Sequence, residues 1–183
     1  MVSRALAYFV SVALSVVWVA PVALAASGAV IAVSRRHGTD HSVIVDRLVT
    51  VWLVAALVAV ALLTLQPRGG GFAPPRDSVL NPLRRPSRQD AFWNVAMFIP
   101  VGFFAALRWR SKARPVVWVT GFSFLASATI ELIQRVAPIH RAASVHDVLF
   151  NTIGGFVGAV IALVVVALVR RSGSRLFSEP IDA

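Results

Sequence analysis

The chain has no cysteine and few charged residues, and both absences limit what it can be. Without cysteine there is no disulfide framework, no thiolate metal site and no thiol nucleophile. Only 14% of the 183 residues are charged, whereas about a quarter are charged in a soluble domain. In contrast, 57% of the residues are hydrophobic, and they fall into blocks long enough to cross a bilayer. The composition therefore predicts a polytopic membrane protein.

Five apolar blocks are separated by polar segments. They run from about residue 5 to 33, 48 to 65, 91 to 107, 115 to 134 and 148 to 169. Because roughly 20 helical residues cross a hydrocarbon core of about 30 Å, this pattern predicts an all-α transmembrane bundle of about five spans. The third block is the shortest and contains Pro100, so we expect a kink or a partly re-entrant path there.

The polar segments divide the chain into four parts. These are two N-terminal spans in residues 1–66, a loop rich in proline, glycine and arginine in residues 67–90, a three-helix core in residues 91–169, and a disordered basic tail in residues 170–183. Arg4, the apolar run after it and an Ala-Leu-Ala sequence imitate a cleavable signal peptide. Because apolar residues continue well beyond that sequence, an uncleaved first helix is expected.

The formal net charge of +10 comes mainly from arginine. No segment outside the apolar blocks is long enough to build a basic surface for nucleic acid. Membrane lipids with anionic headgroups are therefore the expected partners of these side chains, which also set the topology. The short basic connections after the first, third and fifth blocks share one side if there are five spans, and that side is then cytoplasmic. The long second loop, which would then lie on the opposite side, is also basic. The predicted orientation therefore depends on the shortest connections.

Glu131 is the only carboxylate inside a long apolar stretch, and a charge there by default marks a functional site. The polar residues of the fourth block recur at steps of three and four and so share one helical face: Thr120, Ser123, Ser127, Glu131 and Gln134. Such a face must contact other helices or a water-filled cleft rather than lipid. Close packing accounts for Thr120 and Ser123, but packing does not require a carboxylate.

Further polar residues stand at the ends of the neighbouring blocks. Asn94 lies near the start of the third block, and Asp147 and Asn151 open the fifth. Gly154 and Gly158 form a GxxxG motif on the adjoining part of the same face, so the fifth span is expected to dock closely through this side. By topology, Asn94, Asp147 and Asn151 share one membrane face with Glu131 and Gln134.

The loop between the fourth and fifth blocks contributes Arg141, whose guanidinium would complete a compact cluster of acids and amides. Because a purely structural clamp would have the same composition, the cluster is interpreted either as such a clamp or as a ligand site at the outer headgroup level. His140 and His146 lie near Asp147, but their spacing matches no tight ligand motif. No metal and no cofactor is therefore expected.

These motifs, taken in order, resemble the VanZ-like family of bacterial membrane proteins, named for a teicoplanin-resistance protein. The elements that carry the resemblance lie between about residues 89 and 169: Asn94, FIPVGF at 98–103, ELIQ at 131–134, RAASVHD at 141–147 and NTIGGFVG at 151–158. Many relatives have an R-x-F-D-x-x-D pattern, and this chain carries Ser144 where the first Asp would fall. The resemblance implies an integral protein of the cell envelope, associated in some members with lowered sensitivity to teicoplanin, a glycopeptide antibiotic.

Three functions are consistent with these residues. The first is non-enzymatic binding of a headgroup, a cell-wall lipid intermediate or a glycopeptide-type amphiphile at an extracytoplasmic cluster, with these ligand-binding candidates: Asn94, Glu131, Gln134, Arg141, Asp147 and Asn151. The alternative is an intramembrane enzyme acting on a lipid-linked phosphate or glycosidic substrate, with Glu131 as acid or base and Arg141 as phosphate clamp. The absence of an activated nucleophile or phosphate-cradling loop in the sequence favours binding. A proton or ion carrier ranks last, because acidic groups do not continue along the span. The sequence indicates no oligomeric state.

Overall fold

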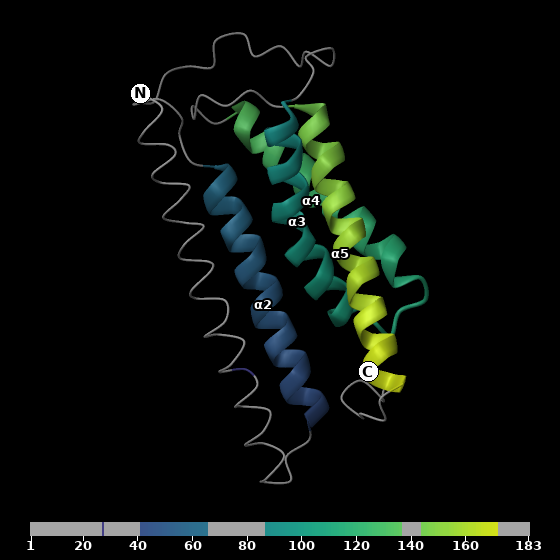
Figure 1. The fold of residues 1–183 in the computed structure, drawn as a ribbon. Coiled ribbons are helices and arrows are strands. Elements are labelled where there is room, and N and C mark those ends of the chain that lie inside the picture. The colour runs from purple at the N-terminus through teal and green to yellow at the C-terminus, as the bar shows by residue number, and fades with distance from the viewer. Residues whose placement is uncertain (1–26, 28–40, 66–86, 137–143, 172–183) are drawn as a thin grey trace. The chain divides into compact units, whose positions relative to one another are not determined.

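The computed structural model describes residues 27, 41–65, 87–136 and 144–171 (Figure 1). Its helices are α2 (His41–Thr64), α3 (Arg88–Arg108), α4 (Pro115–Val136) and α5 (Val145–Arg171). All four are long and apolar enough to cross a membrane, which confirms the predicted all-α transmembrane architecture. The first apolar block, residues 5 to 33, lies almost entirely outside the described residues.

The chain divides into two compact units, Met1–Leu48 and Val49–Ala183. Within the first unit, the described residues are Ser27 and the start of α2. The second unit holds the rest of α2 together with α3, α4 and α5.

The helices extend beyond the apolar blocks of the sequence because polar residues continue their first and last turns. At the start of α3, the hydroxyl of Ser87 accepts a hydrogen bond from the backbone N–H of Asp90 at 3.0 Å and donates to its carboxylate at 2.7 Å. This reciprocal cap begins the helix at Arg88. The helix then continues without a break through Pro100 to Arg108, a length of 21 residues. It is thus long enough to span a bilayer, and the structure shows no re-entrant path there.

Glycine residues bring α3 and α5 into close contact. A Cβ atom at Gly158 would overlap the backbone carbonyl oxygen of Ile99, and one at Gly102 would overlap the backbone carbonyl oxygen of Gly155. Both helices therefore approach each other at distances that no larger residue permits. The docking surface predicted from the GxxxG motif is confirmed, and it is the packing that fixes the start of α5 against α3.

α2 contacts the other helices through larger side chains. Val60 packs with Phe98 and Val101 of α3. The rings of Trp52 and Phe104 stack with their centroids 5.8 Å apart and an interplanar angle of 12°. These contacts bury aromatic and branched side chains between α2 and α3 instead of bringing the two backbones together.

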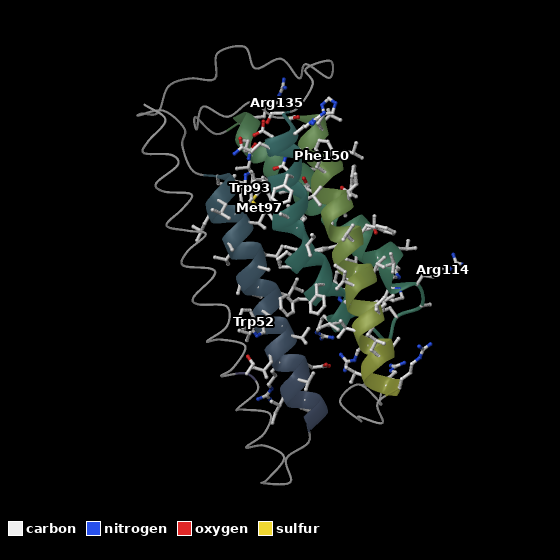
Figure 2. The ribbon with its side chains drawn as sticks, viewed as in Figure 1. Trp52, Trp93, Met97, Arg114, Arg135 and Phe150 are labelled. Carbon is white, nitrogen blue, oxygen red and sulfur yellow. The ribbon has the colours of Figure 1, made fainter. Side chains whose placement is uncertain are left out.

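The second unit has two chemically different ends. The polar end comprises the end of α2, the start of α3, the end of α4 and the start of α5. The basic end comprises the end of α3, the start of α4 and the end of α5. Figure 2 shows Arg135 at the polar end and Arg114 at the basic end. Within the described residues of this unit, the carboxylates all belong to the polar end: Asp90, Glu131 and Asp147.

Candidate functional site

Asn94 and Asp147 meet at the polar end, one from α3 and the other from α5. The Nδ2 atom of Asn94 donates a hydrogen bond to Oδ1 of Asp147 at 2.7 Å, and both side chains are half-buried. Asp147 lies in the first turn of α5, where the helix dipole stabilises a negative charge. Gly154 follows two turns later on the same face, so the close docking of α5 on α3 holds these two side chains together.

Glu131 connects the end of α4 to the start of α5. Its side chain is only 8% exposed, and its Oε2 atom accepts a hydrogen bond from the backbone N–H of Ser144 at 2.7 Å. The carbonyl of Ser144 in turn accepts from the N–H groups of Asp147 and Val148, as the residue that caps a helix does. The Glu131 carboxylate thus lies beside the positive end of the α5 dipole.

Gln134 connects α4 to the end of α2. Its Nε2 atom donates to the carbonyl oxygen of Thr64 at 2.9 Å, in a buried contact. Thr64 is the last residue of α2, and the carbonyls of a final helical turn have no partner within the helix. Sequence reasoning missed Thr64. The signal that would have found it is its position at the end of the second span, on the same membrane face as Gln134.

Asn151 lies one turn deeper than Asp147. Its Nδ2 atom donates to the hydroxyl of Ser127 at 2.8 Å, and both side chains are buried. The remaining polar atom of Asn151, Oδ1, is buried without a hydrogen-bond partner among the described residues, as is the hydroxyl of Ser123. Ser123 lies against Gly155, so its small size allows close packing, as the sequence suggested. Thr120 donates to the carbonyl of Val116 in its own helix at 2.8 Å.

The predicted cluster can be followed for five of its six candidates. Asn94, Glu131, Gln134, Asp147 and Asn151 are described, and their contacts connect α2, α3, α4 and α5 at one end. Arg141 lies outside the described residues, so its place in the cluster stays a prediction, and the same holds for His140. Among the residues that the structure describes, no group of three or more His, Asp or Glu side chains is arranged to hold a metal ion.

The cluster has the chemistry of a hydrogen-bonding site at one end of an apolar helical bundle. A carboxamide offers two N–H donors and a carbonyl acceptor, and the contacts above use one donor from each of Asn94, Gln134 and Asn151. Hydrogen bonds to other side chains and to the backbone hold these groups in position, and each carboxamide has a second N–H donor. Such pre-arranged polar groups at the end of an apolar bundle can orient the polar part of an amphiphilic molecule.

Comparison with known proteins agrees with the motifs. A family model described as VanZ/LLP1 matches residues 9–167. This range includes every candidate site residue, and it begins well before residue 89, where the motifs that carry the resemblance start. Searches of curated proteins and of solved structures gave no significant match. The chain, with its spanning helices and its ordered set of motifs, therefore belongs to the VanZ/LLP1 family of VanZ-like membrane proteins.

Proposed function

We propose that this membrane protein binds an amphiphile at its polar end without catalysing a reaction on it. The ligand is a lipid headgroup, a cell-wall lipid intermediate or a glycopeptide of the teicoplanin type. One observation carries the proposal: at one end of an otherwise apolar bundle, polar side chains of α3, α4 and α5 bind one another or the backbone at the end of α2 and the start of α5. Polar and charged groups in this setting are energetically costly, and they mark a functional site by default.

Aromatic side chains beside the cluster support an amphiphilic ligand. Phe92 is 63% exposed and Trp93 is 39% exposed, and their rings meet edge to face with centroids 5.3 Å apart. Trp93 lies near the polar end, as Figure 2 shows, and aromatic rings are enriched where helices meet the membrane interface. A ligand with both a polar and an apolar part would contact the cluster and these rings together. Arg141, from the adjoining loop, is proposed to pair with an anionic group of that ligand.

No specific observation favours the catalytic alternative. In the described part of the chain, Glu131 accepts a backbone hydrogen bond from a helix start, which is the contact of a carboxylate that fixes two helices. The hydroxyl of Ser127 accepts from Asn151 and is buried below the cluster. Binding therefore remains the function that this arrangement of side chains supports best.

Binding is tested with the full chain reconstituted in nanodiscs, using teicoplanin and a fluorescent cell-wall lipid intermediate as probes. We expect saturable binding of at least one probe and at least a tenfold weaker affinity for Glu131→Gln, because a hydrogen bond to a charged group contributes about 1.5–3 kcal/mol. The matched control is Asp90→Asn, which removes the same charge from an exposed side chain at the same end. Saturable binding with equal affinity for both variants would contradict the role of Glu131, and no binding of either probe would contradict the proposed ligand class.

The polar end is proposed to face the extracytoplasmic side. Its support is the charge difference between the two ends: Arg108, Arg110, Lys112 and Arg114 fill the connection between α3 and α4 at the basic end. Short basic connections are retained in the cytoplasm. The polar end would then lie where cell-wall intermediates and glycopeptides are accessible.

Cysteine labelling measures this orientation directly, because the chain has no native cysteine. Arg135→Cys places a thiol at the polar end, and Arg114→Cys places one at the basic end; both positions are exposed. In intact spheroplasts, a membrane-impermeant maleimide is expected to label Arg135→Cys and to label Arg114→Cys only after permeabilisation. The opposite pattern would put the polar end in the cytoplasm and remove its access to extracellular ligands.

A further inference from the structure

The basic end has a corner where cationic side chains lie next to an exposed apolar helix face. Lys112 and Arg114 are both exposed and come just before α4. Arg110, in contrast, donates its Nη1 to the carbonyl oxygen of Leu107 at 2.9 Å and so completes the end of α3. Within residues 49–65, 87–136 and 144–171, no carboxylate belongs to this end. The corner therefore presents positive charge that no acidic side chain of the described unit offsets.

Lys112 lies above the indole of Trp118. Its Nζ atom is 5.8 Å from the ring centroid, within the range of a cation–π contact. Trp118 is 60% exposed and belongs to the first turn of α4, so its ring faces away from the bundle. Tryptophan is enriched at the headgroup level of membranes. The contact thus keeps the Lys112 ammonium beside a residue type that favours the headgroup level.

Gly121 leaves a shallow depression in the surface of α4, next to Trp118. Trp118, Gly121 and Leu125 recur at steps of three and four, so they share one face of α4. Leu125 is 64% exposed, whereas a Cβ atom at Gly121 would meet nothing within 4 Å. Glycine lowers helix stability by about 1 kcal/mol relative to alanine, and no packing contact in the described residues requires it here. The space between the two large side chains suits a hydrocarbon chain.

We propose that this corner binds one anionic phospholipid of the surrounding bilayer. Lys112 and Arg114 would contact the phosphate, and one acyl chain would lie along α4 over Gly121, between Trp118 and Leu125. Charge complementarity selects the anionic lipid, since cationic groups at the membrane surface attract anionic headgroups and do not distinguish zwitterionic ones in the same way. The site is independent of the proposed function, because it lies at the opposite end of the helices.

Native mass spectrometry of the full chain in detergent, titrated with phosphatidylglycerol or phosphatidylcholine, tests this proposal. The unsubstituted chain is expected to bind phosphatidylglycerol about tenfold more tightly, and the double variant Lys112→Gln/Arg114→Gln is expected to lose that preference. The matched control, Arg88→Gln/Arg135→Gln, removes the same charge from exposed arginines at the polar end and is expected to keep it. An equal loss in both double variants would show a general charge effect and overturn the site.

Two further measurements test the contacts of the acyl chain and of the phosphate separately. Gly121→Leu keeps both cations but fills the depression at residue 121. It is expected to weaken phosphatidylglycerol binding about threefold or more. Unchanged affinity in this variant would overturn the placement of the acyl chain. Inorganic phosphate at millimolar concentration is expected not to displace the lipid. Displacement by phosphate alone would identify a simple anion site and overturn the assignment to a phospholipid.

Discussion

Replacement of Gly158 by alanine is expected to lower the free energy of unfolding by about 1–3 kcal/mol, although alanine is the better helix former. The added methyl group would overlap the carbonyl oxygen of Ile99 and lie 2.7 Å from the backbone nitrogen of Phe103. Both neighbours are backbone atoms of α3, so they can move away only if the two helices separate. Equilibrium denaturation in mixed micelles, followed by circular dichroism, measures the loss.

The control for this substitution is Gly121→Ala on the exposed face of α4. No atom lies near the added methyl group there, so only the helix propensity changes, and a gain of about 0.5–1 kcal/mol is expected. The two variants thus make the same chemical change with opposite expected signs. A gain in stability for Gly158→Ala would show that α3 and α5 are not in close backbone contact.

Replacement of Glu131 by alanine is expected to lower the free energy of unfolding by about 1–3 kcal/mol. The partly buried backbone N–H of Ser144 would lose the acceptor that lies 2.7 Å from it, and the start of α5 would lose one of its hydrogen-bonded links to α4. Hydrogen exchange of the first turn of α5, measured by mass spectrometry, is expected to increase in this variant, alongside the lower stability in denaturation.

Glu131→Gln distinguishes the structural role of this side chain from its charge. Glutamine keeps a carbonyl oxygen at the same distance along the side chain, so it can still accept from Ser144. We expect its stability to stay within about 1 kcal/mol of the unsubstituted chain, with normal exchange at the start of α5. If glutamine were as damaging as alanine, the charge itself would hold the helices together. A binding defect of this variant would then report on folding.

Much of the fold and of the candidate site could be predicted from the sequence because membrane helices leave strong signals. Apolar blocks of about 20 residues located α4 and α5 to within a few positions, and the GxxxG motif correctly predicted the face that docks on α3. The alternation of direction between successive spans predicted that Asn94 and Asp147 share one membrane face, and the structure joins the two by a hydrogen bond.

The remaining contacts involve the backbone, which carries no sequence signal of its own. Gln134 binds the carbonyl oxygen of Thr64, and Glu131 binds the N–H group of Ser144, whereas sequence reasoning sought side-chain partners. Any residue type presents these backbone groups, so only the geometry of the helix ends identifies them. The observed helix bounds differ from those of the apolar blocks for a related reason. The start of α3, for example, depends on the hydrogen-bonded cap by Ser87, which a hydrophobicity pattern does not record.

The contact between Glu131 and Ser144 also has a consequence for how the chain enters the membrane during synthesis. Its two partners are 13 positions apart, so the acid finds its acceptor only once the beginning of the following helix has emerged. α4 has a mean hydropathy of 1.7, against 2.7 for α5, and it carries a buried acid that a lone helix would expose to acyl chains. We therefore expect the insertion machinery to retain α4 until α5 arrives, and to release the two into lipid as one hairpin.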